Sequence, residues 1–205
     1  MDTIGIFSTP IGKIGSFLTE DECLFMKRYS EETEYHSYER TSKMSLETNV
    51  LGKNFSDIKT RLEETFTKFA YKTLGVKQTC DFKITNSWAT STLPNGYSDK
   101  HSHSNSYWSG VLYFDDDTSP LMLYKKPEPS VFLLEVETIN NYSTTKISVK
   151  PDKGDVVFFP SHIEHQISSN TSSSVRHSIA FNIIPNGIFG YHDSLCNIQV
   201  FELEI

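Results

Sequence analysis

The hydrophobic pattern of this chain changes its period near residue 80. Before that point, apolar side chains recur at spacings of three and four, as on a helix that buries one face: Leu51, Phe55, Ile58, Leu62, Phe66 and Phe69. After it, short β-branched and aromatic runs alternate with turn residues. The chain is therefore predicted to begin with helices and to continue with many short strands.

Local signals mark the ends of these elements. The capping-box pattern Thr19-Glu-Asp-Glu22 predicts a helix to about Ser30. The longer helix is expected over residues 55–74, with Gly75 as its stop signal. A strongly alternating tail over 198–205 is predicted as an edge strand. The other predicted strands cover residues 81–89, 107–114, 121–124, 131–137, 145–149, 155–159, 165–168 and 175–184.

Two helices followed by eight short strands favour a mainly β protein with a jelly-roll core, a double-stranded β-helix, and helices packed outside one sheet. With 205 residues the chain fits a single domain. We expect an N-terminal strand and supporting helices over 1–80, the β core over 81–185, and a C-terminal extension over 186–205.

The amino-acid composition argues against some classes of binding partner. The net charge is -7 and there is no basic run, which argues against general binding to nucleic acid or to an anionic membrane. No segment approaches the ~18 apolar residues of a membrane span, and the N-terminus has no signal-peptide pattern. Cys23, Cys80 and Cys196 are far apart and odd in number, so reduced thiols and a cytoplasmic location are expected. A homodimer is left open.

Histidines gather on the predicted β segments. The side chains of His101 and His103 would project from one face of a strand, with their Cα atoms about 6.6 Å apart. His162 and His165 follow the strand that Pro160 ends, and His165 has the better claim because it begins the next strand. Imidazole suits redox-active divalent metals, so His101, His103 and His165 are the candidate metal ligands. The remaining histidines are interpreted as packing or solvent-facing: His36, His177 and His192.

The last core strand has a polar face and an apolar face. Arg176, Ser178, Ala180 and Asn182 share the polar face, which suits the inside of a cleft, and the residues between them suit the underside of the helices. Arg176 is therefore expected to point into the barrel, where the histidines must also point. An arginine near a metal is suited to clamp a carboxylate.

Five motifs follow one another along the predicted β region: Asn86-Ser-Trp88, His101-Ser-His103, Ser109-Gly-Val-Leu-Tyr113, Gly154-Asp-Val-Val-Phe-Phe-Pro-Ser161 with His165, and Arg176-His-Ser-Ile-Ala-Phe-Asn182. In these motifs and in their order the chain resembles the 2-oxoglutarate–iron(II) oxygenases, and the resemblance reaches from the opening residues to about residue 185. It implies a double-stranded β-helix with Fe(II) and 2-oxoglutarate as cofactors.

The resemblance also implies roles for single residues. Three protein ligands would leave three positions on Fe(II), two for 2-oxoglutarate and one for O2, and the products would be succinate, CO2 and an oxidised substrate. Arg176 would hold the distal carboxylate, with Ser178 adding a hydroxyl donor. Asn86 and Trp88 would line the cavity and Tyr113 would hydrogen-bond the co-substrate, although a structural role remains open for each of these three. The primary substrate could be a peptide side chain, a nucleobase or a small metabolite.

The candidate metal ligands of this chain differ from those of the wider oxygenase superfamily. The wider superfamily uses His-x-Asp and a distal His, whereas His103 stands here where the Asp would be. A neutral imidazole makes the site more cationic by one charge and still suits iron. Asp99, two residues before His101, is a candidate substitute carboxylate.

Two other interpretations stay open. One is a cupin-type metalloprotein, a dioxygenase or isomerase that uses three histidines without 2-oxoglutarate. The usual cupin glutamate is absent between Ser104 and Gly110, and Arg176 would have no assigned role. The other is a non-catalytic jelly-roll binding module.

Overall fold

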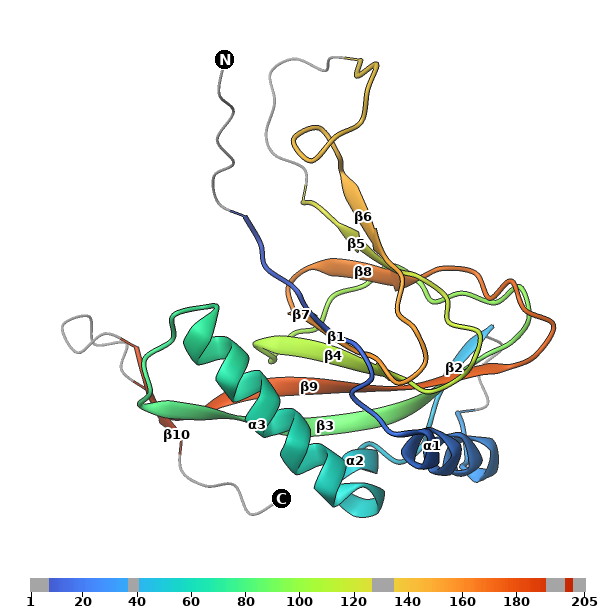
Figure 1. Ribbon diagram of the computed structural model, residues 1–205, viewed down its shortest axis with the longest axis horizontal. Coiled ribbons are helices and arrows are strands. Elements are labelled where there is room, and N and C mark those ends of the chain that lie inside the picture. The colour runs from blue at the N-terminus through green and yellow to red at the C-terminus, as the bar shows by residue number, and fades with distance from the viewer. Residues whose placement is uncertain (1–7, 37–40, 127–134, 191–197, 201–205) are drawn as a thin grey trace.

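The computed structural model describes residues 8–36, 41–126, 135–190 and 198–200 (Figure 1). Its helices are α1 (Glu20–Glu32), α2 (Val50–Asn54) and α3 (Ser56–Lys72). Its strands are β1 (Gly12–Ile14), β2 (Ser42–Met44), β3 (Cys80–Thr92), β4 (Trp108–Tyr113), β5 (Leu121–Tyr124), β6 (Lys146–Val149), β7 (Val156–Pro160), β8 (Glu164–Ile167), β9 (Arg176–Phe189) and β10 (Ile198–Val200).

The strands of the described part of the chain form two antiparallel sheets. The larger has the order β1-β7-β4-β9-β3-β2, with β10 paired to β9, and the smaller has the order β6-β5-β8. In Figure 1 the smaller sheet lies above β4 and β9 of the larger one. This two-sheet architecture is the predicted mainly β double-stranded β-helix.

Two hydrophobic layers hold the fold together. One lies between the helices and the outer face of the larger sheet, where Phe66 contacts the rings of Phe82, Trp108 and Phe158. The other lies between the two sheets and contains Val111 and Phe159. Because successive side chains of a strand point to opposite faces, β7 contributes side chains to both layers. All of its residues are therefore buried.

Gly110 is required by the packing between β4 and β9. A Cβ atom at this position would lie 2.3 Å from the end of the Phe181 ring, so only glycine lets that ring lie across β4. This contact brings β4 close to β9, and these two strands carry much of the site described below.

The helix prediction was right at α1 and incomplete afterwards. Thr19 makes both hydrogen bonds of the capping box with Glu22. The predicted long helix is preceded by a separate short helix, because Phe55 leaves helical geometry (φ -142°, ψ 46°) between α2 and α3. The ring of Phe55 is buried there, with its centroid 5.3 Å from those of both Phe25 and Tyr29. Tertiary packing thus overrides the continuous helical period.

The strand predictions differ from the structure at few places. β5 coincides with the predicted 121–124, while β3 and β9 are longer than 81–89 and 175–184. The predicted strand 131–137 is wrong at 135–137, which are irregular, and 131–134 lie outside the described residues. β2 was not predicted, and only residues 198–200 of the predicted tail strand are described. Among the described residues, no helix has the length and apolar character needed to cross a membrane.

Candidate metal centre and its cavity

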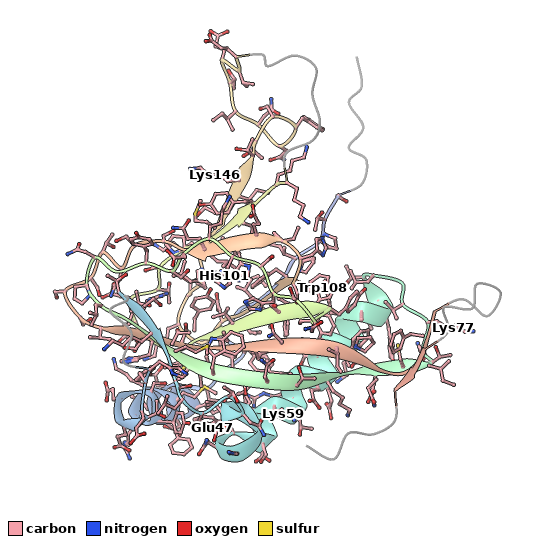
Figure 2. All side chains as sticks on the ribbon, turned by 180° about the vertical axis from the view of Figure 1, so that it is seen from behind. Glu47, Lys59, Lys77, His101, Trp108 and Lys146 are labelled. Atoms are coloured by element: carbon pink, nitrogen blue, oxygen red, sulfur yellow. The ribbon has the colours of Figure 1, made fainter. Side chains whose placement is uncertain are left out.

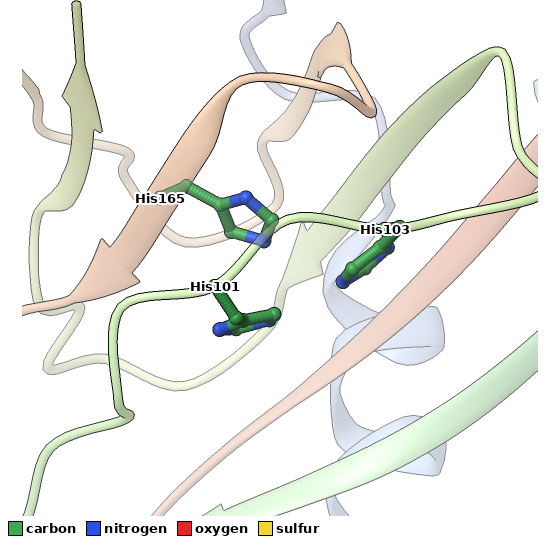
Figure 3. Close-up of side chains that lie close together, drawn as sticks. All are labelled: His101, His103 and His165. Carbon is green, nitrogen blue, oxygen red and sulfur yellow. The ribbon is translucent and has the colours of Figure 1, made fainter. Parts of the chain in front are cut away.

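His101 and His103, which are two residues apart in the sequence, meet His165 (Figure 3), and Figure 2 shows His101 between the two sheets. The ligand atoms of His101, His103 and His165 all lie within 4.8 Å of one another. His165 lies on β8, and His101 exchanges two backbone hydrogen bonds with it, of 3.0 and 2.8 Å. The expected strand at 101–103 is wrong, since only His101 forms an isolated bridge, although both rings still reach the cluster.

Each of the three rings has an oxygen acceptor at Nδ1. The backbone oxygen of Asp99 lies 2.7 Å from Nδ1 of His101, and that of Ile163 lies 2.9 Å from Nδ1 of His165. A carbonyl oxygen only accepts hydrogen bonds, so these two Nδ1 atoms carry the proton and Nε2 keeps its lone pair. Metal-binding histidines have the same arrangement, in which the second ring nitrogen donates to an oxygen.

The surroundings favour neutral rings. His165 is 4% exposed, and burial lowers its pKa to about 3. Burial also lowers the pKa of His103, and the nearby His101 lowers it further. Because a metal binds the neutral imidazole, both rings are in the protonation state that binding requires.

The cluster opens onto a cavity of about 760 Å³. Strand β3 contributes Asn86 and Trp88 to its wall, and β9 contributes Arg176 and Ser178. The Trp88 ring also contacts that of His103, at 5.6 Å between centroids. The cavity therefore lies along the inner face of β3 and β9.

Arg176 is almost wholly buried, with 2% of its surface exposed, yet it is poorly paired. Its Nη2 donates to the Thr92 hydroxyl at 3.2 Å, whereas Nε and Nη1 have no hydrogen-bond partner within the described residues. Burial lowers the pKa of Arg176, but an arginine side chain remains charged in proteins. The cavity thus carries a buried positive charge with free donors.

Tyr113 adds a further donor near this charge. Its hydroxyl is buried and has no partner within the described part of the chain, and burial raises its pKa. Tyr113 and Arg176 interact electrostatically, each affecting the pKa of the other. A buried cation with unpaired donors beside it suits a carboxylate ligand.

The other residues singled out from the sequence lie as follows. Ser178 lines the cavity and hydrogen-bonds the Thr90 hydroxyl at 2.6 Å. Asp99 lines the cavity but is not part of the three-histidine cluster, and His162 is exposed and outside it. His36 makes a backbone hydrogen bond to Met44, and His177 lies against Asp115 on the helix side of β9. His192 lies outside the described residues.

Sequence reasoning gave no role to four residues that contact the site: Thr92, Ser109, Ser161 and Asn182. Asn182 hydrogen-bonds His103 Nδ1 at 2.6 Å, and Thr92 bonds Arg176. The alternation of β9 already placed Asn182 on the same face as Arg176, so strand parity was the signal that could have found it.

Comparison with known proteins agrees with this geometry. A family model described as "Putative 2OG-Fe(II) oxygenase" matches residues 86–182. A search among curated protein sequences returns no significant match.

Solved structures share the fold at low sequence identity. The non-heme alpha ketoglutarate dependent carbocyclase SnoK from nogalamycin biosynthesis aligns with a TM-score of 0.62 and 14% identity, over 96% of this chain and 90% of that one. A Pseudomonas putida prolyl-4-hydroxylase aligns at 0.58 and 14%, over 85% and 93%. HygX from Streptomyces hygroscopicus, solved with nickel and 2-oxoglutarate bound, aligns at 0.57 and 10%, over 85% and 82%.

Identities this low show the fold alone, whereas the family match covers the segment that contains all the candidate site residues. That segment matches the 2-oxoglutarate–iron(II) oxygenase family model, and the fold around it is one that solved members of such families share.

Proposed function

We propose that this protein is a 2-oxoglutarate-dependent oxygenase that holds Fe(II) through the Nε2 atoms of His101, His103 and His165, with a histidine in place of the usual carboxylate ligand. The observation that carries this proposal is the shared orientation of the three rings. Their ligand atoms converge within 4.8 Å while each Nδ1 has an oxygen acceptor. Imidazole nitrogen is a suitable ligand for iron, so the donor set fits the metal.

Arg176 receives the distal carboxylate of 2-oxoglutarate in this proposal. Its free Nε and Nη1 offer two donors, and the Tyr113 hydroxyl offers a third. Thr92 holds the guanidinium through Nη2, and Ser178 lines the same cavity. The charge pair formed with the carboxylate offsets the cost of keeping Arg176 buried.

When bound together, Fe(II) and 2-oxoglutarate supply the activation of O2, with succinate and CO2 as products alongside the oxidised substrate. The protein contributes orientation and exclusion of water. Arg176 fixes the co-substrate at one end, the three imidazoles fix the metal at the other, and the apolar walls at Val111 and Phe159 limit access of water.

The cavity has room for a substrate as well. About 760 Å³ lies in the range of sites that hold drug-sized ligands, and 2-oxoglutarate is much smaller than these. Asn86 and Trp88 line this cavity, and Trp88 also contacts the ring of His103. We propose that the substrate C–H bond approaches the metal along this wall of β3.

The three-histidine cupin interpretation gives no role to the buried, underpaired Arg176. Calorimetric titration separates the two: the protein is loaded with Ni(II), which does not turn over, and then titrated with 2-oxoglutarate. We expect one molecule to bind per metal, and no comparable binding after the metal is removed with EDTA. Binding that is absent at millimolar 2-oxoglutarate would favour the cupin interpretation, and binding that does not depend on the metal would contradict the proposed contact between the co-substrate and the metal.

A further inference from the structure

We propose that Asn182 is a positioning residue for the metal site. Its side-chain oxygen holds His103 with the proton on Nδ1 and so turns Nε2 of that ring toward the other two histidines. The inference rests on the proposed function only in assuming that the cluster binds a metal. It concerns the one ligand at which this chain departs from the carboxylate-containing pattern.

His103 differs from the other two histidines in what orients it. His101 and His165 each meet the backbone oxygen of the residue two positions earlier, Asp99 and Ile163, so their own segments orient them. His103 instead meets side chains: the Oδ1 atom of Asn182, 79 positions away, lies 2.6 Å from its Nδ1, and the Ser109 hydroxyl lies farther from the same atom, at 3.0 Å. Its orientation therefore depends on a residue that can be replaced without changing the local backbone.

The hydrogen-bond network around Asn182 favours the Nδ1–H form of His103. The Ser109 hydroxyl donates to Asn182 Oδ1 at 2.9 Å, and Ser161 donates to the Ser106 hydroxyl at 2.8 Å. Ser106 in turn donates to the backbone oxygen of Trp108 at 2.9 Å. Each of these hydroxyl protons then has an acceptor other than His103, and the two lone pairs of Asn182 Oδ1 accept from Ser109 and from His103.

The side chains at the centre of this hydrogen-bond network are buried. Ser109 and Ser161 are 1% and 0% exposed, and Asn182 is 8% exposed. A polar atom that loses its partner in such surroundings cannot easily turn to water, so the network has few alternative states. The strand itself is held on both sides, since Asn182 lies opposite Ser109 of β4 and opposite Asn86 of β3.

One face of β9 thus carries residues of both the proposed co-substrate site and the metal site. Arg176 and Ser178 line the cavity from β9, and Asn182 orients the third ring from the same strand. The spacing between the co-substrate clamp and the metal is thereby fixed by the rise of a single strand.

The test compares Asn182→Leu, which has a similar size but no acceptor, with Asn182→Asp, which keeps an acceptor. The matched control is Asn186→Leu, because Asn186 lies on the same strand and donates to Asp81 rather than to the site. The first readout is the imidazole nitrogen spectrum of the metal-free protein by NMR. We expect Nδ1–H for His103 in the wild type, in Asn182→Asp and in Asn186→Leu, and loss of that single form in Asn182→Leu.

The second readout is affinity for Ni(II) and Co(II). Loss of an outer partner of a metal-binding histidine typically costs 10–100-fold in metal affinity, so we expect that loss in Asn182→Leu and none in Asn182→Asp or Asn186→Leu. A folded Asn182→Leu protein with unchanged affinity and an unchanged His103 tautomer would overturn the proposal. If Asn182→Leu does not fold, Asn182→Asp decides alone: loss of Nδ1–H or a tenfold weaker affinity would overturn it.

Failure of the proposed function would look different. A wild type that binds metal but not 2-oxoglutarate would refute the oxygenase mechanism and leave the role of Asn182 standing. An Nε2–H form of His103 in the metal-free wild type would refute the role of Asn182, whatever the co-substrate result.

Discussion

The guanidinium of Arg176 and the hydroxyl of Tyr113 lie buried on neighbouring strands of the larger sheet and interact electrostatically, yet both keep unpaired donors. Within the described part of the chain, Nε and Nη1 of Arg176 and the Tyr113 oxygen have no partner. Buried donors without partners destabilise a protein unless a ligand uses them. A dicarboxylate that reaches from this point to the three histidines would satisfy them.

Replacing Arg176 by alanine should weaken 2-oxoglutarate binding by about 2–4 kcal/mol, the range for loss of one partner of a buried charged pair. Metal affinity should be unchanged, because Arg176 is not in the histidine cluster. Calorimetry on the Ni(II)-loaded protein measures both. Arg61→Ala is the control, since Arg61 pairs with Glu22 on the helix side and should leave co-substrate affinity at the wild-type value.

Tyr113→Phe should separate binding from stability. The hydroxyl has no partner in the described structure, so its removal should leave the thermal stability of the ligand-free protein unchanged or slightly higher. Co-substrate affinity should fall by about 1.5–3 kcal/mol, as for a hydrogen bond to a charged group.

Tyr35→Phe should behave in the opposite way. The Tyr35 hydroxyl donates to the Ser30 backbone oxygen at 2.8 Å, so its loss should cost about 1 kcal/mol of stability and none of the co-substrate affinity. Equal co-substrate affinities in Tyr113→Phe and the wild type would contradict the role given to Tyr113.

His165→Ala should remove most of the metal affinity, whereas His162→Ala should retain it. The ring of His165 belongs to the cluster, and His162 is exposed and outside it. Anaerobic titration with Fe(II) or Co(II) gives the comparison, and the reverse order of the two variants would show that the wrong histidine was chosen.

The stability of the metal-free protein should depend on pH through His165. Burial lowers the pKa of this ring to about 3 in the folded state, while a histidine in the unfolded chain titrates near 6.5. Below about pH 6.5 the unfolded chain takes up a proton that the folded protein does not. This contribution is therefore complete above pH 6.5 and is lost progressively as the pH falls toward 3.

The decline should approach about 1.4 kcal/mol per pH unit for this one group. Urea unfolding of the EDTA-treated protein between pH 4 and pH 8 measures it. His165→Gln should show a flatter profile than the wild type, and two parallel profiles would contradict the assignment.

The periodic features of the sequence predicted most of the fold and the strand face of β9 that lines the cavity. Alternation along β9 placed Arg176 and Ser178 on the face that lines the cavity, and the capping box at Thr19 predicted the start of α1. Both signals are local, because they depend on which way successive side chains point.

Features that depend on contacts across the fold could not be read in this way. The break at Phe55 follows from its packing on Phe25 and Tyr29, against a continuous helical pattern. The joining of His101 to His165 depends on backbone hydrogen bonds between segments 64 positions apart, and the first of these segments is not in a regular strand.

The most direct test of the central claim is an anaerobic optical titration of the wild-type protein with Fe(II) and 2-oxoglutarate. Bidentate binding of the co-substrate to iron produces a weak visible metal-to-ligand charge-transfer band. We predict that this band saturates at one iron and one 2-oxoglutarate per chain, and that it is lost in His165→Ala and weakened in Arg176→Ala. An Fe(II)-loaded protein that shows neither the band nor binding at millimolar 2-oxoglutarate would contradict the proposed mechanism.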